Sequence, residues 1–194
     1  MPEAVAPDLD LLFPAALALP VKMLVLDVDG VLTDGGLYYG DQGLAIKRFD
    51  VQDGLGIKLA QQVGLEFSLI SGMESAALRQ RARDLGISEC YAGSLDKLPI
   101  LQDIMRRKGL DWPAVACLGD DLPDLPLLRR AGLALAVQNA QPEVRRAAHY
   151  VSPLFGGRGA VRQILRQILL AQGRLEELLA RFTPLAEQGA MPAR

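Results

Sequence analysis

Residues 21–36 read VKMLVLDVDGVLTDGG, an apolar run that ends in two carboxylates, one residue apart, followed by a glycine. The apolar stretch Met23–Leu26 predicts a short buried strand. Ligands of open α/β sheets collect beyond the carboxyl ends of the strands, so Asp27 and Asp29 are predicted to lie at a functional site. Gly30 lets the chain turn away sharply behind them.

The rest of the chain alternates between strand-like apolar runs and helix-like segments. The further predicted strands are residues 66–70, 115–118 and 133–137, and the predicted helices are residues 54–63, 75–85, 97–108, 125–130 and 159–182. Such alternation is typical of a parallel sheet with helices on both faces. The sequence therefore predicts an α/β fold, with a Rossmann-like doubly wound parallel sheet flanked by helices.

One segment departs from this alternation and predicts a β-hairpin at residues 35–49. Two short apolar runs around Tyr38 and Ile46 are joined by Gly-Asp-Gln-Gly, a turn with glycine at both ends. The hairpin directly follows the Asp-rich loop and could project beside a site there. The chain is otherwise predicted to consist of an N-terminal extension (residues 1–20), one domain (21–182) and a C-terminal tail (183–194).

The composition excludes several functional classes. With 194 residues, half of them hydrophobic, the chain suits one globular domain. A net charge of −2 gives no field for nucleic acid or an anionic membrane. Two cysteines and one histidine disfavour a disulfide framework or a zinc site. No segment resembles a signal peptide or a membrane span, so we expect a cytoplasmic protein that binds neither nucleic acid nor membrane.

Further polar residues follow other predicted strands or begin a helix. Asp120, Asp121 and Asp124 come after one apolar run, Ser71 after another, and Lys97 stands at the start of a predicted helix. Each residue alone is an ordinary cap, turn former or solvated side chain. Together they offer carboxylates for a hard cation such as Mg²⁺, and a hydroxyl and an ammonium for an anion, which points to phosphoryl chemistry.

The order Asp-x-Asp-Gly, Ser, Lys and Gly-Asp-Asp-x-x-Asp resembles the haloacid dehalogenase superfamily of phosphatases. Three stretches narrow the likeness: LDVDGVLTDG at 26–35, FDVQDG at 49–54 and GGRGAVR at 156–162. These are similar to the 3-deoxy-D-manno-octulosonate 8-phosphate phosphatase family. The resemblance runs from about Val21 to Leu178.

The resemblance implies a role for each matching residue. Asp27 would attack phosphorus, and Asp29 would protonate the leaving sugar oxygen and later activate water. Ser71 and Lys97 would bind the phosphoryl oxygens. The implied cofactor is Mg²⁺, held by Asp27, the backbone carbonyl of Asp29, and Asp120. Supporting roles fall to Asp121 and Asp124.

The same resemblance implies a set of residues that surround the sugar acid. The residues expected to bind substrate are Asp29, Asp50, Val51, Gln52, Asp53, Gly54, Lys58, Met73, Arg81 and Lys97. Similar proteins usually carry arginine at the positions of Gln52, Lys58 and Met73. Arginine grips a carboxylate through two parallel hydrogen bonds, which none of these replacements can reproduce. Arg81 either compensates or is a solvated helix residue.

The resembling family lacks the cap domain found in other superfamily members, and no segment between Asp29 and Ser71 is large enough to form one. The predicted hairpin takes that place. In the family the hairpins meet at the centre of a tetramer, and a neighbouring subunit helps to wall each site, so we expect a homotetramer. The alternative is a hairpin that merely decorates an edge.

Three other functions remain open. The first is a phosphatase for a different phosphorylated sugar or a nine-carbon sugar acid. The second is a receiver-type phospho-acceptor domain, which is disfavoured because Asp27 ends the first strand and no Asp ends the strand before Ser71. The third is a non-catalytic binding subunit, which would be expected to lose Asp27 or Asp29.

Overall fold

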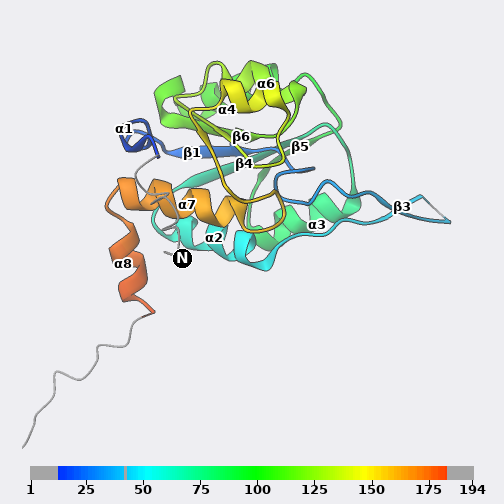
Figure 1. The fold of residues 1–194 in the computed structure, drawn as a ribbon, viewed down its shortest axis with the longest axis horizontal. Coiled ribbons are helices and arrows are strands. Elements are labelled where there is room, and N and C mark those ends of the chain that lie inside the picture. The colour runs from blue at the N-terminus through cyan, green and yellow to red at the C-terminus, as the bar shows by residue number, and fades with distance from the viewer. Residues whose placement is uncertain (1–12, 42, 183–194) are drawn as a thin grey trace, which may run out of the picture.

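The computed structural model describes residues 13–41 and 43–182 (Figure 1). Within these ranges a six-stranded sheet has the order β5-β4-β1-β6-β7-β8, and every neighbouring pair is parallel. The strands are β1 (Met23–Leu26), β4 (Glu66–Ser71), β5 (Glu89–Ala92), β6 (Val115–Gly119), β7 (Leu133–Ala136) and β8 (Tyr150–Val151). The order reverses at β1, so the predicted doubly wound α/β fold is confirmed.

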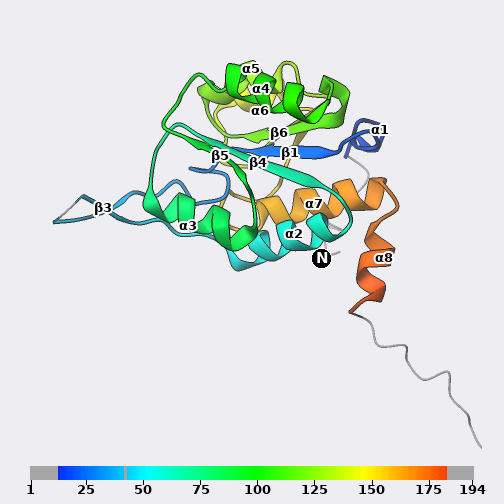
Figure 2. The same cartoon turned by 180° about the vertical axis from the view of Figure 1, so that it is seen from behind.

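Helices cover both faces of the sheet, as Figures 1 and 2 show from opposite sides. One face carries α2 (Val51–Gln62), α3 (Ala76–Leu85) and α7 (Ala160–Ala171), and the other carries α4 (Leu98–Lys108), α5 (Leu125–Leu128) and α6 (Pro142–Ala147). The remaining helical segments are α1 (Ala15–Ala18), α8 (Leu175–Ala180) and the 3₁₀ turns Trp112–Ala114 and Leu122–Asp124. None of the described helices is long and apolar enough to cross a membrane.

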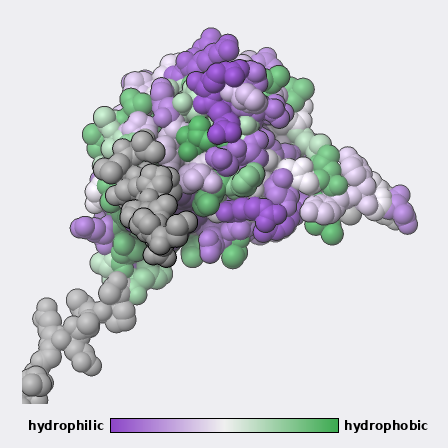
Figure 3. Space-filling model, in the orientation of Figure 1, coloured by the Kyte–Doolittle hydropathy of each residue, from purple (hydrophilic) through white to green (hydrophobic). Residues whose placement is uncertain are grey.

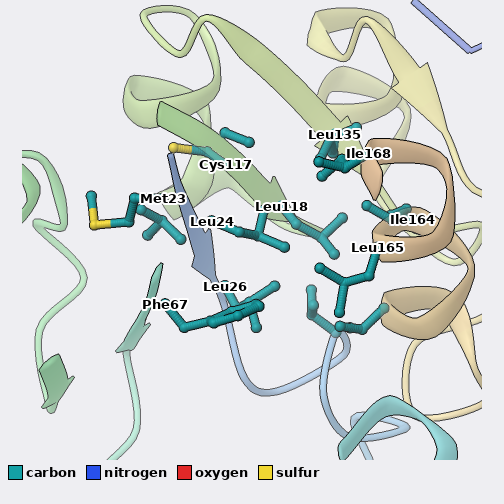
Figure 4. Packing of buried hydrophobic residues seen from close by; sticks show 14 of the residues in the cluster. Met23, Leu24, Leu26, Phe67, Cys117, Leu118, Leu135, Ile164, Leu165 and Ile168 are labelled. Carbon is teal, nitrogen blue, oxygen red and sulfur yellow. The ribbon is translucent and has the colours of Figure 1, made fainter. Parts of the chain in front are cut away.

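The central strand is buried on both faces, which explains its unbroken apolar sequence. Leu24 and Leu26 are fully buried, and Figure 4 shows side chains from α7, including Ile164 and Leu165, in the same cluster. The ladder continues one residue past β1, because Asp27 donates its backbone N–H to the carbonyl of Leu118 (3.0 Å). The rigid centre of the sheet therefore sets the position of Asp27.

The element boundaries differ from the prediction in ways that have local causes. Helix α2 begins at Val51 rather than residue 54, because the Asp50 carboxylate caps it by accepting from the N–H groups of Gln52 and Asp53. The predicted helix 159–182 is two helices, α7 and α8, separated at Gly173, which has a φ of +68°. The unpredicted strands β5 and β8 lie at the sheet edges and are short.

The predicted hairpin is present as β2 (Tyr38–Gly40) and β3 (Gly43–Ile46), paired antiparallel. It projects from the body of the protein (Figure 3). Among the hairpin side chains whose exposure is described, Leu37, Tyr38, Tyr39 and Ile46 are apolar and exposed.

The predicted boundaries between extension, domain and tail stay predictions. Residues 1–12 and the tail 183–194 lie outside the described residues. Within the described part of the extension, Ala18 is buried in the core and Phe13 packs edge-on against Tyr150.

Candidate active site

The polar residues predicted from strand ends meet in one open cleft of about 340 Å³ at the carboxyl edge of the sheet. Asp27 follows β1, Ser71 ends β4, and Asp120 follows β6, so three adjacent parallel strands supply them. The cleft is lined by Asp27, Asp29, Ser71, Gly72, Met73, Leu95, Lys97, Asp120, Asp121, Pro123 and Asp124. The expectation that parallel strand ends gather these side chains is confirmed.

Lys97 joins two carboxylates beneath the cleft. Its Nζ donates to Asp27 Oδ1 (2.5 Å) and to Asp124 Oδ1 (2.7 Å), and the lysine is 3% exposed. Burial lowers the pKa of Lys97, but the charges of Asp27 and Asp124 together raise it by more. The pKa of Lys97 therefore lies above its usual value. Lys97 therefore carries its positive charge into the cleft floor.

One ammonium does not offset the acidic cluster around it. Burial, and then the charge of Asp124, raises the pKa of Asp27 to about 6, although Lys97 opposes the shift. Burial, and then the charges of Asp27 and Asp124, raises the pKa of Asp120 to about 8. The positive charge of Lys97 is not enough for these carboxylates, and a bound cation would add to it.

The donor set fits a small hard divalent cation. Asp27, Asp120 and Asp124 each place a carboxylate oxygen within 4.8 Å of the others. Asp124 is already engaged, because its Oδ1 accepts from Lys97 and its Oδ2 from the backbone N–H groups of Asp120 and Asp121. Asp120 Oδ1 is buried and has no hydrogen-bond partner. Mg²⁺ prefers oxygen ligands, and the unsatisfied Asp120 Oδ1 is free to be one of them.

The loop after Asp29 is held closely against this cluster. Gly30 has a φ of +93°, and a Cβ there would lie 2.1 Å from Asp120 Oδ2, so only glycine fits. Asn139 donates from Nδ2 to the Gly30 carbonyl (3.0 Å) and accepts from the Gly156 N–H (2.7 Å). Asn139 was not predicted, because nothing in its local sequence indicates that it bridges two loops.

Asp29 occupies a different environment from Asp27. Lys47 donates from Nζ to both carboxylate oxygens of Asp29, at 2.6 and 2.7 Å. Ser71 Oγ lies 3.4 Å from Asp29 Oδ2 and also exchanges contacts with the backbone of Met73. Sequence reasoning missed Lys47, since a lysine that follows a hairpin strand usually faces solvent.

Most of the residues predicted to surround the sugar acid lie outside the cleft lining. These are Asp50, Val51, Gln52, Asp53, Gly54, Lys58 and Arg81. The start of α2 instead packs against the loop before α7, where Asp53 accepts from the N–H groups of Gly159 and Arg162. Of the three positions where similar proteins usually carry arginine, only Met73 lines the cleft.

Lys58 and Arg81 both lie outside the cleft lining, and Arg81 is engaged in other contacts. The Lys58 ammonium lies near Gly86, 3.6 Å from where a Cβ on that glycine would sit. Gly86 caps the C-terminus of the ten-residue helix α3, which is the end farther from Ser71. Arg81 donates to the Asp50 carbonyl (2.9 Å), and its guanidinium lies 5.5 Å from the centre of the Phe49 ring. A role for either in substrate binding stays a prediction.

Asp53 offers a test of a structural role against a binding role. Asp53→Ala should lower stability by about 2 kcal/mol, since it leaves the buried N–H of Gly159 and the partly buried N–H of Arg162, at the start of α7, without acceptors. For a chain of this size that corresponds to a Tm lower by about 4–8 °C. Asp53→Asn keeps one side-chain oxygen as an acceptor, so its stability should fall by less. Thermal unfolding at matched protein concentration measures both.

The pH dependence provides the control. Burial raises the folded-state pKa of Asp53 from 3.8 to about 6, so this group adds stability as the pH falls below about 6. That contribution should vanish in Asp53→Asn, so lowering the pH from 7 to 5 should stabilise this variant less, or destabilise it more, than the wild type. Unchanged unfolding in both variants, together with lost activity, would instead support the predicted binding role.

Comparisons with known proteins show which family this chain resembles. The family model for haloacid dehalogenase-like hydrolases matches residues 81–159. The 3-deoxy-D-manno-octulosonate 8-phosphate phosphatase of Escherichia coli K12 is 41% identical over 157 residues, which is 81% of this chain and 84% of that protein.

Solved structures show the same likeness. The 3-deoxy-D-manno-octulosonate 8-phosphate phosphatase of Moraxella catarrhalis, solved with a magnesium ion, a phosphate ion and the KDO molecule, has a TM-score of 0.85 at 38% identity. The match covers 87% of this chain and 97% of that one. The cobalt-bound form of the deoxy-D-mannose-octulosonate 8-phosphate phosphatase from Haemophilus influenzae has a TM-score of 0.79 at 40% identity, and the match covers 82% of this chain and 93% of that one.

Identity at this level over most of both chains, together with the shared fold, establishes the family. This chain belongs to the 3-deoxy-D-manno-octulosonate 8-phosphate phosphatase family of haloacid dehalogenase-like hydrolases.

Proposed function

We propose that this protein is a Mg²⁺-dependent phosphatase that hydrolyses 3-deoxy-D-manno-octulosonate 8-phosphate through an aspartyl-phosphate intermediate. The observation that carries the proposal is the pair of carboxylates with different surroundings. Asp27 is buried against Lys97 in the acidic cluster, whereas Asp29 lies beside it, paired with Lys47 and 25% exposed at its side chain. The two carboxylates can therefore take different roles, and the family resemblance assigns the nucleophile to Asp27 and the acid–base role to Asp29.

In the first half-reaction an oxygen of Asp27 attacks phosphorus and the bond from phosphorus to the sugar oxygen breaks. Asp29 gives its proton to that leaving oxygen. Lys97 and Ser71 hold the phosphoryl oxygens in the cleft during the transfer. The second half-reaction reverses the proton movement: Asp29 takes a proton from water, the water oxygen attacks phosphorus, and phosphate leaves Asp27.

Asp27, Asp120 and the backbone carbonyl of Asp29 are proposed to hold the Mg²⁺, and Asp124 orients Lys97 and the loop around Asp120. When bound, Mg²⁺ supplies positive charge that offsets repulsion between Asp27 and the incoming phosphate. Asp121 caps the 3₁₀ turn that contains Asp124, by accepting from the N–H of Leu122.

The names of the relatives support the octulosonate 8-phosphate as the substrate. Because Gln52, Lys58 and Met73 stand where arginine is expected, a different phosphorylated sugar or a nine-carbon sugar acid is the second candidate. A panel of phosphorylated sugars and sugar acids, assayed for phosphate release with Mg²⁺, tests it. The octulosonate 8-phosphate should give the highest kcat/KM. A higher value for a nine-carbon acid or a neutral sugar phosphate would transfer the assignment to that compound.

Met73→Arg tests whether the cleft lacks a grip on the sugar carboxylate. Met73 lines the cleft beside Ser71, and a guanidinium there adds charge-assisted hydrogen bonds worth roughly 1.5–3 kcal/mol. We expect kcat/KM for the octulosonate 8-phosphate to rise by about tenfold or more, with no gain for a neutral sugar phosphate. Equal gains for both substrates would show that the new charge attracts phosphate rather than the carboxylate.

We further propose that the protein is a homotetramer and that it is cytoplasmic. The support for the tetramer is the projecting hairpin, whose Leu37, Tyr38, Tyr39 and Ile46 are apolar and between 43% and 68% exposed. Packing of hairpins against each other would cover these side chains and bring a neighbouring subunit close to the cleft.

A further inference from the structure

We propose that Lys47, at the base of the hairpin, is a positioning residue that holds Asp29 in place for proton transfer; this inference rests on the proposed function. Lys47 follows β3 directly, and its side chain is 1% exposed. Its ammonium contacts both oxygens of the Asp29 carboxylate, at 2.6 and 2.7 Å. The ammonium that pairs with Asp27 and Asp124 is that of Lys97, so Lys47 has no role yet in the proposed mechanism.

Burying an ammonium is costly unless a charged partner meets it. Within the described residues, Asp29 is the group that pairs with Lys47. A lysine that served only to cover apolar surface would keep its ammonium in water. Because the buried Lys47 charge meets one carboxylate in the cleft, we infer that Lys47 is there to hold Asp29 in position.

The remaining contacts of the Asp29 side chain are too weak to fix it. Ser71 Oγ lies 3.4 Å from Oδ2 and hydrogen-bonds the backbone of Met73 at 3.1 Å. A general acid must stay within hydrogen-bond reach of the leaving oxygen. Lys47 restricts rotation of the carboxylate, and it retains an oxygen acceptor whether or not Asp29 carries a proton.

The hairpin base is itself anchored, so that Lys47 has a fixed starting point. Phe49 forms an antiparallel bridge with Thr33, in the loop that carries Asp29. Arg48 donates from Nη1 to the Gly157 carbonyl (2.7 Å). The chain on the C-terminal side of Lys47 is therefore tied to two loops beside the cleft.

The test compares leaving groups. Lys47→Met and Lys47→Arg are assayed on octulosonate 8-phosphate, whose alkoxide needs a proton to leave, and on p-nitrophenyl phosphate, whose phenolate does not. We expect Lys47→Met to lower kcat/KM about 10–100-fold for the sugar phosphate and less than about threefold for the aryl phosphate. Lys47→Arg, which keeps the charge, should recover part of the loss.

A double-mutant cycle identifies the route. In an Asp29→Asn background, Lys47→Met should cause no further loss if Lys47 acts through Asp29. Lys108→Met, which removes a lysine paired with Glu66 on the surface, is the matched control and should match the wild type on both substrates.

Equal losses on both substrates, or additive losses with Asp29→Asn, would overturn the inference in favour of a general structural role. If Lys47→Met does not fold, Lys47→Gln replaces it in the same comparisons. A wild-type protein that hydrolyses neither substrate would instead refute the proposed function, so the two failures are distinguishable.

Discussion

Asp27→Asn is expected to abolish turnover, lowering kcat by about 10³-fold or more. The amide keeps the shape of the side chain and can still accept from Lys97, but it is a poor nucleophile toward phosphorus. The backbone position should not change, because Asp27 extends the ladder of the buried strand β1. Steady-state phosphate release with Mg²⁺ measures the effect.

Intact-protein mass spectrometry after rapid acid quench supplies a second readout. The wild type should show a fraction carrying one phosphoryl group, and Asp27→Asn should show none. A variant that keeps near-normal turnover, or that still carries the phosphoryl group, would contradict the assignment of Asp27 as the nucleophile.

Asp29→Asn should be the next most damaging change, lowering kcat/KM for a sugar phosphate by about 10²–10⁴-fold. Asparagine preserves the size of the side chain but cannot give a proton to the leaving oxygen. The loss should be much smaller for p-nitrophenyl phosphate, whose leaving group departs without a proton. Steady-state kinetics on the two substrates measure this difference.

Asp103→Asn is a suitable control for Asp29→Asn, because it also removes one carboxylate, from an exposed ion pair on α4 with Arg106 and Arg107. It should leave both substrates unaffected. If Asp29→Asn lowers kcat/KM equally for both substrates, Asp29 contributes to binding rather than to protonation of the leaving group.

The fold was predictable wherever burial leaves a strong mark on the sequence. The strands β1, β6 and β7 are apolar throughout because helices cover both faces of the sheet, and β4 is buried at every residue after Glu66. Edge strands carry no such mark: β5 reads Glu-Cys-Tyr-Ala and is half-buried, and β8 has two residues. The sequence does not predict β5 and β8, because an edge strand that is short or only half-buried needs no continuous apolar run.

The site was predictable to the extent that parallel strands align their ends. Asp27, Ser71 and Asp120 each sit beside such an end, so their meeting follows from topology. Lys47 and Asn139 arrive from other segments, and only the tertiary fold brings them to the loop at Asp29 and Gly30. Local sequence around either residue is ordinary.

The residues expected to bind the sugar acid could not be placed by topology in the same way. The stretch FDVQDG at 49–54 and the loop at 156–162 were identified through family resemblance, which says nothing of what each side chain touches. Within the described chain these stretches pack against each other through Asp53, outside the cleft lining. Any contact of theirs with the sugar acid requires a test of its own.

The measurement that tests the central claim most directly is phosphate release from 3-deoxy-D-manno-octulosonate 8-phosphate, with and without Mg²⁺. Protein freed of metal by a chelator should release no phosphate above background, because the proposed site at Asp27, Asp120 and the backbone carbonyl of Asp29 then lacks its cation. Adding Mg²⁺ in excess of the chelator should restore full turnover. Undiminished turnover in excess chelator, or no turnover with saturating Mg²⁺, would contradict the account.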